Sequence, residues 1–264
     1  MVLFSSKKNC EEQQVEHSYM ALRQVIGILG MFLPFAVVFF AAVFGTEDCL
    51  PQNCFSTISA TYHTNAGPIM VGLLFCVGLF LITYNGYDKQ DNIVSTVSGI
   101  AAMGIAFFPC TLKVLSIDPS GHSLGTRVGI LHLPIEISNI IHLSLAATFF
   151  FLLAYNSFFL FTKTKDKENM TKEKKNRNLL YRICGLVIFV SMICILVINL
   201  LYTFVFSVNP PDFYAFEYTP YGIVFETIML IAFGLSWLTK GGAIMGDIAK
   251  PGEEKITVLG AEKK

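Results

Sequence analysis

Six apolar segments dominate this chain, and each is long enough to cross a membrane as a helix. A helix needs roughly 20 residues to cross the ~30 Å hydrocarbon core of a bilayer. We therefore predict an all-α fold, a polytopic membrane bundle of six transmembrane helices. The predicted spans cover residues 24–46, 66–86, 92–112, 137–161, 183–207 and 219–239.

The composition agrees with a membrane domain and leaves no room for a separate soluble one. Of the 264 residues 53% are hydrophobic and only 14% are charged, whereas charged residues make up about 25% of a soluble domain. We divide the chain into an N-terminal tail (1–22), a transmembrane domain (23–240) and a C-terminal tail (241–264).

Positive charges avoid every second connection between the predicted spans. All of the 19 Lys and Arg residues except Lys113 and Arg127 lie before the first span, after the last span, or in the second and fourth connections. Basic residues near membrane spans stay on the cytoplasmic side. We therefore expect both termini to be cytoplasmic, in a multi-pass protein of the cytoplasmic (inner) membrane.

The fourth connection, Lys163–Arg182, carries eight of these basic residues. Each basic residue near an anionic membrane surface contributes ~1 kcal/mol of attraction, so we expect this stretch to contact anionic lipid headgroups. No aromatic residue between Thr162 and Leu180 offers a ring for a base to stack on, so we expect no nucleic-acid partner. Lys240 ends the last span, where its amino group is expected to extend to the aqueous interface.

Three cysteines fall on the predicted outer side. Cys49 and Cys54 are close in sequence, and Cys110 follows the third span. Disulfides form in oxidising compartments. Either a Cys49–Cys54 or a Cys54–Cys110 disulfide fits this placement, and one thiol is left over in each case.

Two predicted spans contain an ionisable residue, His142 and Glu226. Such residues inside a membrane usually have a partner or a function. The two side chains are at comparable depth and can meet, either locking their helices together or forming part of a site. Asn139 shares a helical face with His142, and His63, His132 and Glu136 precede spans on the same outer side. We therefore predict an outward-facing polar pocket formed by these six residues.

Small residues predict where the helices approach one another, because helix packing in lipid depends on close contact. They are Gly27 and Gly30 in the first span, Gly72, Cys76 and Gly78 in the second, and Ser98, Ala102 and Ala106 in the third.

Our preferred interpretation is a non-catalytic module that binds lipid or a small amphiphile in this pocket, without a cofactor. The alternative is a metal-dependent intramembrane lipid hydrolase. Ser59-Ala-Thr-Tyr-His63 resembles the Ser-x-x-x-His pattern of the alkaline ceramidase and adiponectin-receptor hydrolase superfamily. That resemblance implies a zinc ion that activates water for attack on an amide or ester. The residues would be Ser59, His63, His132, His142 and Glu226. Here the last span carries Glu226 where that group has a His-x-x-x-His pair.

As a whole the chain resembles a bacterial family of six-span membrane proteins of unknown function. The resemblance rests on Arg23-Gln-Val-Ile-Gly-Ile-Leu-Gly30, Ile141-His-Leu-Ser-Leu-Ala146, Asn178-Leu-Leu-Tyr-Arg-Ile-Cys-Gly185, Phe225-Glu-Thr-Ile and Ala232-Phe-Gly-Leu-Ser-Trp237. In layout it is also loosely similar to the Frag1/DRAM/Sfk1 group, whose members are linked to lipid organisation. Both resemblances imply a six-span fold, and neither implies a catalytic residue.

Overall fold

The computed structural model describes residues 2–44, 55–110, 127–129, 131–164, 170–201 and 220–245. Side chains of the first helix are described from His17 onward. The described chain is all-helical, as predicted. Its six α-helices are α1 (Val2–Phe44), α3 (Gly67–Thr83), α4 (Lys89–Phe107), α5 (Ile135–Tyr155), α6 (Lys172–Leu201) and α8 (Tyr221–Lys240).

Three short elements complete the described structure. A 3-10 turn, η1 (Ser59–His63), precedes α3, and a π-helical turn, η3 (Asn156–Leu160), continues α5. A two-stranded antiparallel hairpin of β1 (Arg127–Val128) and β2 (Leu133–Pro134) leads into α5. Neither the hairpin nor these two turns was predicted from the sequence.

Four of the helices are long and apolar enough to cross a membrane: His17–Phe44, Ile135–Leu160, Lys172–Leu201 and Tyr221–Lys240. Helix α3 is apolar but has 17 residues. Large apolar side chains face outward on these helices, including Phe39 (60% exposed) and Ile140 (66% exposed). A soluble monomer rarely exposes such an extensive apolar surface, so these helices are compatible with an integral membrane protein.

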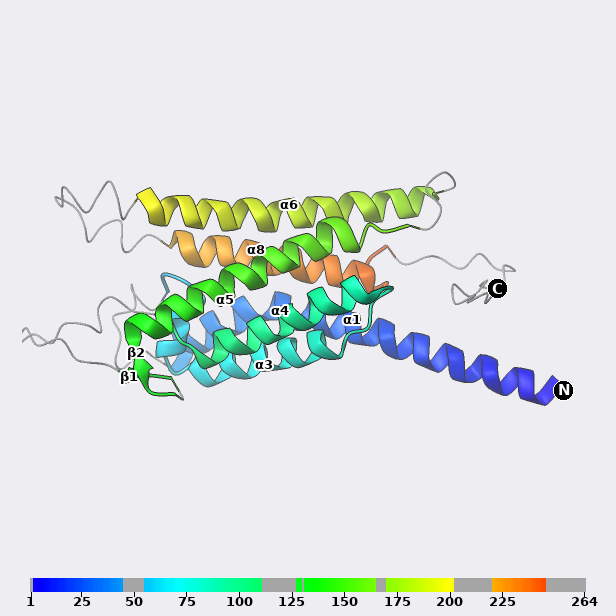
Figure 1. Ribbon diagram of the computed structural model, residues 1–264, viewed down its shortest axis with the longest axis horizontal. Coiled ribbons are helices and arrows are strands. Elements are labelled where there is room, and N and C mark those ends of the chain that lie inside the picture. Colours follow the sequence, from blue (N-terminus) through cyan, green and yellow to red (C-terminus); the bar gives the residue numbers. More distant parts are fainter. Residues whose placement is uncertain are drawn as a thin grey trace, which may run out of the picture.

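The helices form a bundle in which α1 packs against α8, α3 against α4, and α6 against α8. Helix α6 lies along one edge of the bundle, and the N-terminal part of α1 extends beyond the other helices (Figure 1). The hairpin and η1 lie at one end of the bundle. The end of α8 and the start of α6 lie at the other end of the bundle.

Two pairs of glycines bring helices into backbone contact. A Cβ atom added to Gly27 on α1 would lie 2.8 Å from the carbonyl oxygen of Gly234 on α8, and one added to Gly234 would lie 2.6 Å from that of Gly27. Gly78 on α3 and Gly99 on α4 form a second such pair, at 2.8 and 2.5 Å. Both contacts exclude any larger side chain, so glycine sets the distance between these helices.

The predicted packing residues are confirmed on α1 and α4 and only in part on α3. Gly27 and Gly30 lie at the contact with α8, and the predicted ridge of α4 is buried, namely Ser98, Ala102 and Ala106. Of the three predicted residues on α3, only Gly78 contacts a neighbouring helix. No atom lies within 4 Å of a Cβ added to Gly72, and Cys76 is exposed, so that part of the prediction is wrong.

Several helices extend beyond the predicted spans. Helix α1 begins at Val2 and not near residue 24, and α6 begins at Lys172, so much of the basic connection Lys163–Arg182 is helical. The spans were predicted from apolar content, whereas Lys and Glu are good helix formers that let a helix continue outside the apolar region.

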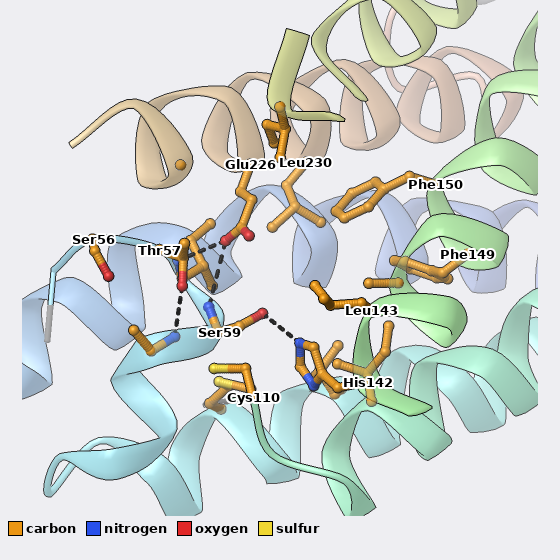
Figure 2. Close-up of a pocket in the computed structure, with 18 of the residues that line it drawn as sticks. Ser56, Thr57, Ser59, Cys110, His142, Leu143, Phe149, Phe150, Glu226 and Leu230 are labelled. Atoms are coloured by element: carbon orange, nitrogen blue, oxygen red, sulfur yellow. Dashed lines mark hydrogen bonds between the residues drawn. The ribbon is translucent and has the colours of Figure 1, made fainter. Parts of the chain in front are cut away.

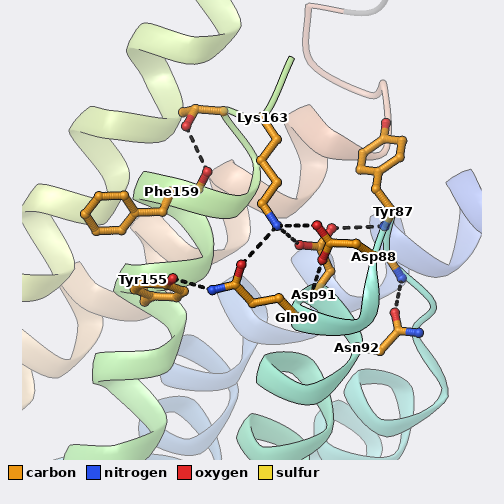
Figure 3. Close-up of polar contacts among 10 residues, drawn as sticks. Tyr87, Asp88, Gln90, Asp91, Asn92, Tyr155, Phe159 and Lys163 are labelled. Atoms are coloured by element: carbon orange, nitrogen blue, oxygen red, sulfur yellow. Dashed lines mark hydrogen bonds and ion pairs between the residues drawn. The ribbon is translucent and has the colours of Figure 1, made fainter. Parts of the chain in front are cut away.

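Charged side chains join α4 to the segment after η3 (Figure 3). The Lys163 Nζ donates to Asp88 Oδ2 and to Asp91 Oδ1, each at 2.8 Å. Asp88 also caps α4, because its Oδ1 accepts the Asp91 N–H at 3.0 Å. The hydrogen bond from Lys163 holds the pKa of Asp88 below its usual value.

Candidate ligand-binding site

A cavity of about 350 Å³ lies between α1, η1, α3, α4, α5, α6 and α8. One side is apolar and includes Leu33, Met70, Leu74, Phe149, Phe150 and Leu230. Polar groups gather at the other side, where Figure 2 shows Glu226 and His142 on either side of Ser59. An apolar cavity with a few convergent polar groups is the usual form of a small-molecule site.

Glu226 projects from α8 onto the start of η1. Its Oε2 accepts the Ile58 N–H at 2.6 Å and the Ser59 N–H at 3.4 Å. The first N–H groups of a helical turn have no partner within the turn, and here a carboxylate from a distant helix supplies one. Thr57 Oγ1 accepts the next free donor, the Ala60 N–H, at 2.9 Å.

The segment before η1 packs directly on the first turn of α8. The Ile223 N–H donates to the Ser56 carbonyl oxygen at 2.9 Å. A Cβ added to Gly222 would lie 2.7 Å from that oxygen and 2.6 Å from Thr57 Cγ2. Glycine at 222 therefore allows the close approach that brings Glu226 over the turn.

His142 is held in one tautomer by its two partners. Its Nδ1 lies 2.6 Å from the Phe108 carbonyl oxygen, which only accepts, so Nδ1 carries the proton. Its Nε2 lies 3.0 Å from Ser59 Oγ and is therefore the acceptor of the Ser59 hydroxyl. Ser59 thus connects the two ionisable residues, through its N–H to Glu226 and through its hydroxyl to His142.

Side chains satisfy three consecutive carbonyl groups where the chain leaves α4. His142 donates to Phe108, Ser138 Oγ donates to Pro109 at 2.8 Å, and His63 Nε2 donates to Cys110 at 2.7 Å. Buried carbonyl groups outside a helix require such partners, because an unpaired buried polar group is costly. Burial lowers the pKa of His63, against the opposing effect of its hydrogen bond to Cys110.

The structure gathers some of the predicted pocket residues and leaves others outside. Asn139, His142 and Glu226 line the cavity together with Ser59. His63 lies next to it, bonded to the Cys110 carbonyl. His132, in the hairpin turn, and Glu136, in the first turn of α5, are exposed and do not line the cavity.

Glu226 and His142 do not share a hydrogen bond, and each instead bonds Ser59. The direct contact considered from the sequence is therefore replaced by a bridge through the 3-10 turn. Sequence reasoning also missed Ser56, Thr57, Asn199 and Tyr221, which line the cavity. Of these four, Asn199 and Tyr221 alone leave a signal in the sequence, since both are polar groups within predicted apolar spans.

The zinc ligands of the alternative interpretation are not brought together. Within the described ranges, no three His, Cys, Asp or Glu side chains form a group that could hold a metal ion. Cys110 is buried at the cavity and forms no disulfide with another described cysteine. Cys49 and Cys54 lie outside the described residues, so the disulfide stays a prediction.

Comparison of the chain with protein-family models, curated proteins and solved structures finds no significant match. The site is therefore interpreted from its own geometry.

Proposed function

We propose that this chain is a six-span protein of the cytoplasmic membrane that binds a lipid or another small amphiphile in the cavity beside Glu226 and His142. The observation that carries this proposal is the division of the cavity into a large apolar wall and one polar side. An amphiphile has the same division. Its chain would contact Leu74, Phe149 and Leu230, and its polar group would face Ser59 and Glu226.

The membrane arrangement in this proposal follows from packing and charge. Helices α3 and α4 pack side by side in the same bundle as the four longer apolar helices. We therefore infer that they also cross the bilayer, which gives six spans. The basic residues then lie with both termini in the cytoplasm, and the cavity opens toward the outer side.

The charges at the cavity favour a particular polar group. Among the described residues that line it, Glu226 is the one acidic residue, and none is Lys or Arg. An anionic group would lack a cationic partner and would face the Glu226 carboxylate. We infer that the ligand presents hydrogen-bond donors or a positive charge.

Filling the cavity tests this function. Ala146 lines the cavity, whereas its neighbour Ala147 faces outward. Native mass spectrometry of gently solubilised protein should find a co-purifying amphiphile on the parent and on Ala147→Phe, and a loss of it on Ala146→Phe. Equal retention by both variants, or no bound amphiphile on the parent, would contradict the proposal.

The hydrogen bond between Ser59 and His142 favours a second function, hydrolysis of a lipid ester or amide. His142 would take the Ser59 proton as Oγ forms a bond to the acyl carbon, and would pass that proton to the leaving group. Water would then cleave the acyl-enzyme. A fluorophosphonate probe should label the parent and not Ser59→Ala if this occurs. Absence of labelling removes this second function. Binding remains the preferred one because Glu226 occupies the Ser59 N–H that would stabilise an oxyanion.

A further inference from the structure

A cluster of basic side chains lies at the end of the bundle opposite the cavity. It consists of Arg23 on α1, Lys174 and Arg177 on α6, and Lys240 on α8, and we call it the basic cluster. Lys240 follows Glu226 by 14 residues on α8, a distance of about 21 Å along a helix. The basic cluster is thus a second feature, separate from the cavity.

Lys240 does not extend away from the protein as the sequence analysis expected. Its Nζ lies 4.6 Å from the centre of the Tyr87 ring and 5.0 Å from that of Phe161. Aromatic faces attract a cation but accept none of its three N–H donors in a regular hydrogen bond. No described residue accepts a hydrogen bond from Lys240 or forms an ion pair with it.

The charges around Lys240 are mostly of the same sign. Among the described residues, its electrostatic neighbours are the other members of the basic cluster and one carboxylate, Asp91. That carboxylate is already paired with Lys163 at 2.8 Å. Neighbouring charges of the same sign raise the free energy of the folded protein, and an anion bound among them would lower that free energy.

Arg23 also has unused hydrogen-bonding capacity. Its guanidinium lies over the Tyr84 ring, with Cζ 5.5 Å from the ring centre. Its Nε is buried and has no hydrogen-bond partner among the described residues. A buried N–H without a partner is costly, so both Arg23 and Lys240 are short of an acceptor.

We propose that the basic cluster binds a phosphate group. A phosphate offers several oxygen acceptors and at least one negative charge, which match the Lys240 ammonium and the Arg guanidinium groups. Three helices supply the donors: Arg23 lies midway along α1, Lys174 and Arg177 lie near the start of α6, and Lys240 ends α8. In a membrane-spanning bundle we infer that this level meets the headgroup region. The phosphate is carried either by an anionic phospholipid or by inorganic phosphate, and both place the same chemical group among the same side chains.

The test measures phosphate binding to the delipidated full-length protein. Native mass spectrometry with short-chain phosphatidylglycerol should give saturable binding that phosphatidylcholine of equal chain length does not match. Lys240→Gln and Arg23→Gln should each weaken this binding about tenfold, since one charge-assisted hydrogen bond contributes roughly 1.4 kcal/mol or more. Lys172→Gln removes an equal charge from an exposed position on α6 and should change binding less than about twofold.

Two further arms complete the test. Lys240→Arg keeps the charge and should retain binding, which separates loss of the site from loss of the fold, as do melting temperatures of all the variants. Competition by inorganic phosphate would identify free phosphate as the ligand, whereas competition only by phospholipid would identify the headgroup. Equal binding by the parent, Lys240→Gln and Lys172→Gln would overturn the proposal, as would no binding to the parent.

Discussion

Removal of the Glu226 carboxylate tests the central contact of the site. In Glu226→Ala the Ile58 N–H loses the acceptor at 2.6 Å, and Ile58 is only 5% exposed. A buried N–H left without a partner costs about 1–3 kcal/mol. The longer bond to Ser59, at 3.4 Å, adds little. Glu226→Gln keeps a side-chain oxygen that can accept the Ile58 N–H, so its cost should be roughly 1 kcal/mol or less.

The assay is thermal unfolding in detergent. A loss of 1 kcal/mol lowers the melting temperature of a protein of this size by about 2–4 °C. The expected decrease for Glu226→Ala is therefore about 2–12 °C, with a smaller decrease for Glu226→Gln. Glu136→Ala removes an exposed carboxylate from α5 and is the control. If both Glu226 variants melt with the parent, Glu226 does not hold η1 and the reasoning is wrong.

Other predictions use the same melting assay. Gly234→Leu should destabilise the protein by about 1–3 kcal/mol, because its side chain would push α1 from α8, whereas Gly72→Leu, with open space around it, should stay within about 0.5 kcal/mol. The pKa of His63 is lowered in the folded protein, so the unfolded chain takes up a proton more readily and stability should fall as the pH drops below about 6.5. His63→Gln should reduce this loss of stability in acid. A variant with the same pH profile as the parent would contradict this prediction. The pKa of Asp88 is lowered by Lys163, so their pairing stabilises the fold above about pH 4 and this contribution is lost as the pH falls through the lowered value. Lys163→Gln should therefore melt below the parent at pH 7, and the gap should close in acid; a gap that persists would count against the ion pair.

Much of the helical architecture could be predicted because membrane helices leave a simple signal. Each apolar segment of about 20 residues corresponds to a helix in the described structure, although the number of crossings remains a prediction. The beginnings of α1 and α6 were not predicted, since charged residues such as Lys172 and Glu173 continue a helix without adding apolar character. Apolar content predicts which residues lie in the membrane region, whereas helix propensity determines where the helix begins and ends.

The candidate site was predictable only where an unusual residue sits inside an apolar segment. Asn139, His142 and Glu226 were found in this way, because polar groups in spans are costly. The role of Ser59 as a bridge depends on backbone N–H groups and on the close approach at Gly222. No local sequence pattern predicts these contacts. His132 and Glu136 were included on sequence position alone; His132 lies in the hairpin turn and Glu136 in the first turn of α5, and both are exposed.

The most direct test of the account is the accessibility of single cysteines in intact cells. Arg127 in the hairpin and Lys172 at the start of α6 are both exposed, and α5 lies between them in the chain. In a background without native cysteines, a membrane-impermeant maleimide should label Arg127→Cys in intact cells and Lys172→Cys only after lysis. Equal labelling of the two positions before lysis would mean that α5 does not cross the membrane, and the outward-facing cavity would be disproved.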